Sequence, residues 1–180
     1  PVAGDLDLGA SFIKRINPLL KKPRPEKEIA HSIVRLRVQA RKGLQEDVGS
    51  GFNIKNGWGG IRDIEFLVQG LQLIHAAQFP DVLFPSTLEA LKKLEEKKVL
   101  NGETLRLLES DYIMFRRIEH FLQIYEDRQT HTLPASQQEL TALSKRLVQN
   151  GRTPDDVFSQ IGKSVTRVRE LFRQEIESRT

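Results

Sequence analysis

A chain of 180 residues with 38% hydrophobic and 29% charged residues is long enough to bury one core, which excludes a disordered or wholly membrane-embedded protein. Because there is no cysteine, disulfides and thiolate metal sites are excluded, and we expect a cytoplasmic protein. The net charge of +4 is small and the basic residues are scattered, so we expect no nucleic-acid partner. No run approaches the roughly 20 apolar residues that span a bilayer, so we expect no membrane partner.

Apolar residues recur at spacings of three and four along the chain, which predicts an all-α fold. The first helix is predicted from Asp5 to about Asn17, where Pro18 would end it. A second helix begins at Pro25, a residue suited to a first helical turn, and runs to about Gly43. Its basic residues are spaced as the solvated side of a helix: His31, Arg35, Arg37, Arg41 and Lys42.

Glycines and asparagines accumulate between Leu44 and Gly60 and predict a loop. A third helix follows from Ile61 to about Gln78. It is apolar nearly all round, which is typical of a buried helix. One of its faces carries Ile61, Ile64, Val68, Leu71 and His75.

Four more helices are predicted, each with a start signal. Ser86 or Thr87 caps a short helix to Lys98, Asn101 caps a long one to about Arg128, and a third runs from Ser136 to about Gln149. Thr153 and Pro154 open the last. Its core face carries Ile161, Val165, Val168, Phe172 and Ile176. We expect one domain over residues 1–180, an antiparallel bundle of about six to seven helices.

The most informative segment surrounds the start of the third helix. On a helix, Arg62, Glu65 and Gln69 fall with Gln72 in one sector of about 80°, a polar stripe on an apolar helix. Because an unpaired buried charge is costly, this stripe must pair internally or face a cleft or another domain. The simplest alternative is an ion pair between Arg62 and Glu65 within the helix.

The glycines before this helix leave backbone donors uncovered, a place where a phosphate could dock. A metal site is not expected there. Asp63 and Glu65 superficially resemble paired acids that hold magnesium, but residues i and i+2 of a helix diverge by about 200°. No Ser/His/Asp arrangement or phosphate-binding loop of a known pattern is present elsewhere.

Read as a string, Lys55-x-Gly57-x-Gly59-Gly60-Ile61-Arg62-Asp63-Ile64-Glu65-Phe66-x-x-Gln69 resembles a signature that follows the catalytic domain of bacterial glutamine synthetase adenylyltransferase/adenylyl-removing enzymes. A looser version occurs in the related uridylyltransferases that modify the PII signal protein. Three more segments match in the same order: Pro1-Val2-Ala3-Gly4-Asp5, Tyr112-x-x-x-Arg116-Arg117-x-Glu119-x-x-Leu122-Gln123 and Asp127-x-Gln129-Thr130-His131-Thr132-Leu133-Pro134.

The resemblance implies a helical domain that packs on an upstream nucleotidyltransferase domain, absent from this chain, which would hold ATP and magnesium. The first and last matching segments resemble the amino-terminal half of that enzyme, the half associated with phosphorolytic removal of AMP from glutamine synthetase. Alone, this chain would have no catalytic residue, no metal and no cofactor. The candidate cleft or substrate-binding residues are Lys55, Gly59, Gly60, Arg62, Asp63, Glu65 and Gln69.

We therefore expect an accessory domain that shapes the active-site cleft and recognises the protein substrate, with its own nucleotidyltransferase domain and glutamine synthetase as partners. The rival hypothesis is a non-catalytic scaffold that binds PII or bridges two catalytic halves. The two differ in where Arg62 points, toward an open cleft or toward an internal partner.

Overall fold

The computed structural model describes residues 3–41, 51–125, 131–134, 136–147 and 154–180. Within these residues the chain forms α-helices and short 3-10 helices and no named strand, so the predicted all-α bundle is confirmed. The helices are α1 (Leu6–Leu20), α2 (Glu26–Gln39), α3 (Ile61–His75), η1 (Pro80–Val82), α4 (Thr87–Glu96), α5 (Gly102–Tyr125), α6 (Gln137–Leu147), α7 (Pro154–Glu175) and η2 (Glu177–Arg179).

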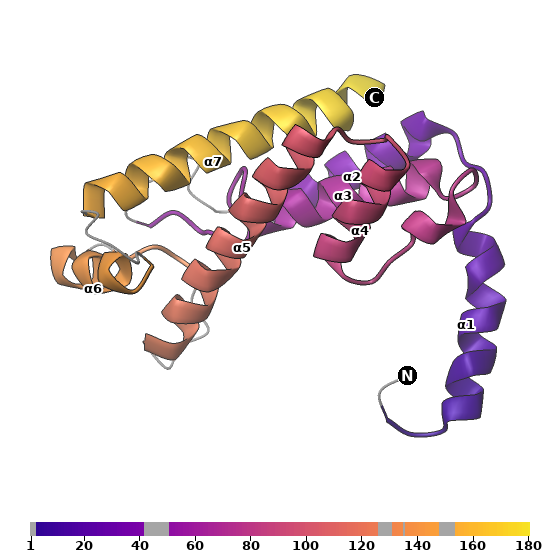
Figure 1. The fold of residues 1–180 in the computed structure, drawn as a ribbon, viewed down its shortest axis with the longest axis horizontal. Coiled ribbons are helices and arrows are strands. Elements are labelled where there is room, and N and C mark those ends of the chain that lie inside the picture. Colours follow the sequence, from indigo (N-terminus) through magenta and orange to yellow (C-terminus); the bar gives the residue numbers. More distant parts are fainter. Residues whose placement is uncertain (1–2, 42–50, 126–130, 135, 148–153) are drawn as a thin grey trace.

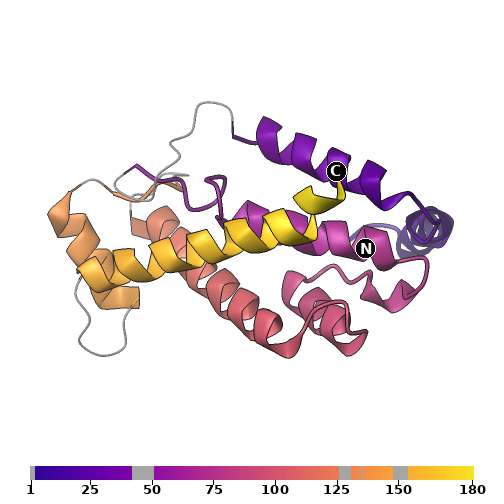
Figure 2. The same cartoon turned by 90° about the horizontal axis from the view of Figure 1, so that it is seen from above.

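Helix α3 is the centre of the fold, as its apolar circumference predicts. Ile61, Ile64 and Leu71 are fully buried, and only His75 of the predicted face is half-buried. The C-terminal half of α7 lies along α3, while its first turns reach α6 (Figures 1 and 2). Helices α2, α4 and α5 also pack against α3. All five residues of the core face predicted for the last helix are buried, four of them in α7 and Ile176 directly after it. Apolar as α3 is, no helix among the described residues could cross a membrane.

The predicted start signals are found at most helix beginnings. The Ser86 hydroxyl accepts from the Glu89 amide at 3.5 Å, and the Asn101 side chain accepts from the Thr104 amide at 2.8 Å. Pro154 is the first residue of α7, while Thr153 lies outside the described residues. The predicted helix ends at Gly43, Arg128 and Gln149 likewise lie outside them.

Helix α1 departs from the prediction because it runs through Pro18 to Leu20. Proline removes one backbone donor, which leaves the Lys14 carbonyl without its helical partner. Lys14 is exposed, so water can bind that carbonyl and the helix continues. The helix also stands away from the other helices, at the opposite end of the molecule from α6 (Figure 1), and buries none of its residues.

Candidate functional site

The loop before α3 is held by a segment from far along the chain. The Ile54 amide donates to the His131 carbonyl at 2.8 Å, and the Leu133 amide donates to the Phe52 carbonyl at 2.8 Å. Asn53 and Thr132 thereby form an antiparallel bridge. The matching segment that carries His131 thereby fixes the backbone directly before the matching string that starts at Lys55. These two segments are thus neighbours in space.

The turn into α3 depends on Gly59. Its φ is +77°, a conformation that L side chains rarely adopt, and a Cβ atom there would lie 2.3 Å from the Val165 carbonyl oxygen of α7. Its amide donates to Oδ2 of Asp63 at 2.7 Å. Glycine therefore allows the loop to approach α7 and to close on the first turn of α3.

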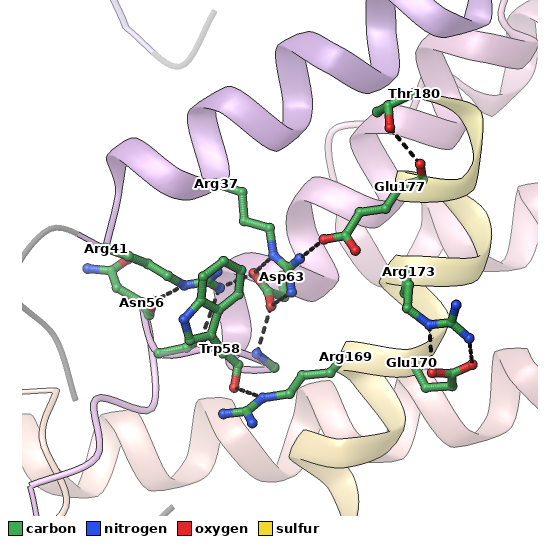
Figure 3. Close-up of polar contacts among 12 residues, drawn as sticks. Arg37, Arg41, Asn56, Trp58, Asp63, Arg169, Glu170, Arg173, Glu177 and Thr180 are labelled. Atoms are coloured by element: carbon green, nitrogen blue, oxygen red, sulfur yellow. Dashed lines mark hydrogen bonds and ion pairs between the residues drawn. The ribbon is translucent and has the colours of Figure 1, made fainter. Parts of the chain in front are cut away.

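Asp63 is a buried anchor. Its side chain is fully buried, and two arginines bind it: Arg37 of α2 through Nε–Oδ1 at 3.0 Å and Nη2–Oδ2 at 2.7 Å, and Arg41, just after α2, through Nη2 to Oδ1 (Figure 3). Arg37 and Arg41 are 3% and 7% exposed, so the prediction that they lie on a solvated side is wrong. A carboxylate can be buried here because both oxygens are paired.

Trp58 covers this anchor. The Arg41 guanidinium lies 3.5 Å from the centre of the Trp58 ring, and Arg37 lies between Trp58 and Phe172, at 4.4 and 3.8 Å from the two ring centres. Arg169 of α7 donates to the Trp58 carbonyl at 3.0 Å (Figure 3). Burial lowers the pKa of Arg41 to about 10, with neighbouring Arg37 contributing, although Asp63 opposes the shift. This side of the segment has a structural role.

The helix start has no spare backbone donors for a phosphate, contrary to the sequence expectation. Gly60 donates to the Gly57 carbonyl at 2.9 Å, Ile61 to Ile54 at 3.0 Å and Arg62 to Lys55 at 2.9 Å. The Asp63 amide donates to the Gly60 carbonyl at 3.1 Å. The loop folds back over the helix start and uses these donors itself, and both Gly59 and Gly60 are buried.

The other side of the segment carries a cluster of charges around a buried carboxylate, Glu119 of α5, whose side chain is 5% exposed. Its Oε2 accepts from Arg116 at 2.7 Å, while the Lys55 ammonium and the His131 Nδ1 lie 3.1 and 3.3 Å from Oε1 as ion-pair neighbours without hydrogen-bond geometry. Burial and then Lys55 lower the pKa of His131, and Arg116 and Arg62 add to the shift. We call this the Glu119 cluster: Lys55, Arg62, Arg116, Glu119 and His131.

Arg62 belongs to this cluster but has no ionic partner among the described residues. Its Nε is buried without a hydrogen bond, and its guanidinium lies 5.7 Å from the centre of the Phe66 ring. The alternative pairing with Glu65 is not formed, because Glu65 instead accepts from the Tyr112 hydroxyl of α5 at 3.2 Å. Arg62 is thus a partly exposed cation that the fold does not neutralise.

The predicted polar stripe is divided by the fold. Gln69 is exposed and Glu65 is half-buried, but Gln72 is buried and donates to the carbonyls of Val82 and Phe84 at 2.7 and 2.9 Å. Gln72 therefore stabilises the η1 turn and is not part of the accessible surface formed by the other residues of the stripe. Asp63 and Glu65 bind different partners, and no group of three metal-binding side chains occurs in the described ranges. They do not fit a shared magnesium ion.

Sequence reasoning did not find Arg37, Arg41, Glu119 or His131 as members of this site. A signal existed for the last two, which lie in segments that match the family. For the arginines, one signal was their spacing of four on the predicted second helix. The other was Asp63, an acid between the apolar residues Ile61 and Ile64 that would need a buried partner.

Comparisons with known proteins identify the family of this chain. A family model described as GlnD PII-uridylyltransferase matches residues 30–176. Proteins named bifunctional glutamine synthetase adenylyltransferase/adenylyl-removing enzyme are 36% identical over 185 residues in Rhizobium meliloti, covering all of this chain, and 39% identical over 150 residues in Mesorhizobium japonicum, covering 82% of it. One from Agrobacterium fabrum is 37% identical and covers 97%.

The chain therefore belongs to the family that the GlnD PII-uridylyltransferase model describes. Its similarity to curated proteins is to a region of glutamine synthetase adenylyltransferases, as the string around Arg62 implied. The chain spans 19%, 15% and 18% of the length of the three relatives, about a fifth or less.

Proposed function

We propose that this chain is the accessory helical domain of a bifunctional glutamine synthetase adenylyltransferase/adenylyl-removing enzyme, and that the face carrying the Glu119 cluster borders the active-site cleft. The supporting observation is the division of one segment into two sides. Asp63 and the glycines are buried and stabilise the fold, whereas Arg62 is partly exposed and has no ionic partner among the described residues.

In this proposal the upstream nucleotidyltransferase domain holds ATP and magnesium and performs the chemistry. The acids of the segment are unsuited to that task, because Asp63 is paired with two arginines. This domain would contribute fixed positive charge at the edge of the cleft, through Arg62 and Lys55. Such a charge stabilises negative charge that develops on a phosphoryl group in a partly desolvated site. Glutamine synthetase would be the protein substrate.

The experiment is a comparison of two arginine variants in the full-length protein that contains this domain. We expect Arg62→Ala to lower adenylyl transfer to, or removal from, glutamine synthetase by about tenfold or more. Arg173→Ala, on the exposed side of α7 and paired with Glu170, is the matched control and should leave activity unchanged. Equal activity of both variants and the unmodified protein would refute the proposal.

One observation favours the rival scaffold function, and it lies on another element. Helix α1 exposes several large apolar side chains: Leu6, Leu8, Phe12, Ile13 and Leu19. Exposed apolar surface of this kind is typical of an interaction site. A scaffold that binds PII or bridges two catalytic halves would use this helix. Phe12→Ser should then weaken binding to PII or to the other catalytic half, while Arg62→Ala leaves that binding unchanged.

A further inference from the structure

The Glu119 cluster has more positive charge than its carboxylates compensate. Two permanent cations, Lys55 and Arg116, lie against the carboxylate of Glu119. A third, Arg62, is near enough to His131 to lower its pKa, and Glu65 beside them is bound by a neutral hydroxyl. Even with both carboxylates counted, the cations are in excess. The Lys55 and His131 side chains are 28% and 21% exposed and that of Arg116 is 49% exposed, so the excess is accessible to a ligand.

The cluster is also preorganised. Glu119 is nearly fully buried and holds Arg116 and Lys55, which come from α5 and from the loop before α3. The loop itself is fixed by its pairing with the segment that carries His131. A ligand would therefore meet cations whose positions are already set, which reduces the entropic cost of binding.

We propose that the Glu119 cluster binds a phosphate dianion, either free phosphate or the phosphate group of a nucleotide. Guanidinium groups match the oxygens of phosphate geometrically, and a lysine adds a point charge. Arg62 adds a partly exposed guanidinium that has no ionic partner among the described residues. The proposal extends the proposed function of this face, but it requires no catalysis.

A hollow beside the cluster gives room for the rest of a nucleotide. It has a volume of about 470 Å³, within the usual size of ligand pockets, and its lining includes Arg116 and Glu119 of the cluster. Leu88 and Ile113 give the same hollow apolar lining. A nucleoside could be placed there with its phosphate on Arg116.

The test is a titration of the 180-residue chain at constant ionic strength, followed by NMR of the His131 imidazole. Inorganic phosphate should give saturable shifts and raise the pKa of His131, because a dianion beside the ring favours its protonated form. Arg62→Gln and Arg116→Gln should each weaken binding by about tenfold. Arg173→Gln makes the same charge change on a distant helix and should have no effect.

Three further ligands identify the source of the phosphate. Adenosine 5′-monophosphate binding more tightly than phosphate, with adenosine not binding, would assign the site to a nucleotide, and equal affinity for the two anions would assign it to free phosphate. Chloride at equal ionic strength should cause no shift at His131. The proposal is overturned if phosphate fails to saturate at millimolar concentration, or if Arg173→Gln weakens binding as much as both cluster variants do. Failure here would leave the activity test of Arg62→Ala unaffected, so the two proposals can fail separately.

Discussion

Arg62 and Asp63 are consecutive residues of α3, yet the fold treats them in opposite ways. Asp63 is fully buried and both of its oxygens are paired with arginines, Arg37 of α2 and Arg41 just after that helix. Arg62 is partly exposed, and its Nε has no hydrogen-bond partner. The difference follows from helix geometry, because adjacent residues are separated by about 100° and so face different neighbours. One short segment can therefore carry both a structural anchor and a functional group.

The largest expected effect is that of breaking the anchor. Asp63→Asn removes the charge that compensates the buried guanidinium of Arg41 and, together with Glu177, that of Arg37. We expect a loss of about 3 to 5 kcal/mol in the free energy of unfolding. Denaturant unfolding of the 180-residue chain measures it. Glu170→Gln, which removes an exposed carboxylate, is the control and should change little. If the two variants unfolded alike, the structural role of Asp63 would be wrong.

A glycine variant tests whether the loop must approach α7 closely. Gly59→Ala combines a left-handed backbone with a clash at the Val165 carbonyl, and we expect it to cost about 2 to 5 kcal/mol. Gly162→Ala is the matched control, because a Cβ in the middle of α7 meets no atom within 4 Å. It should stabilise the chain by about 0.5 to 1 kcal/mol. An unchanged unfolding midpoint for Gly59→Ala would show that the loop can move away from α7.

A smaller effect should appear on acidification, and it belongs to the Glu119 cluster. The folded protein lowers the pKa of His131 below 6.5, so between about pH 7.5 and 5.5 the unfolded chain takes up a proton that the folded protein resists. Stability should therefore fall as the pH falls through that window. His131→Gln should reduce the pH dependence, and His31→Gln, on an exposed position, should not. Equal dependence in both variants would contradict the assignment.

Local patterns predicted much of the fold. The apolar circumference of α3 identified the central helix, and the periodic face predicted for the last helix identified five residues that are buried. Caps at Ser86 and Asn101 were visible because a cap is defined within four residues. Pro18 misled because a single lost donor on an exposed helix does not end that helix.

The site was only partly predictable because its partners are distant in the sequence. Asp63 is bound by residues 26 and 22 positions away, and the loop around Ile54 pairs with His131. Periodicity gives the face on which a residue lies, but not the element that packs against that face. The stripe of Arg62, Glu65 and Gln69 was therefore visible, while the Glu119 cluster and the loss of Gln72 to the η1 turn were not.

The most direct test of the central claim, that Arg62 is free of the anchor that holds Asp63, is the unfolding free energy of Arg62→Ala in the 180-residue chain. We predict a change within about 1 kcal/mol, because the guanidinium has no ionic partner among the described residues and loses only its contact with Phe66. A loss of about 3 to 5 kcal/mol, equal to that expected for Asp63→Asn, would mean that Arg62 is itself part of a buried ion pair and would contradict the division of the segment.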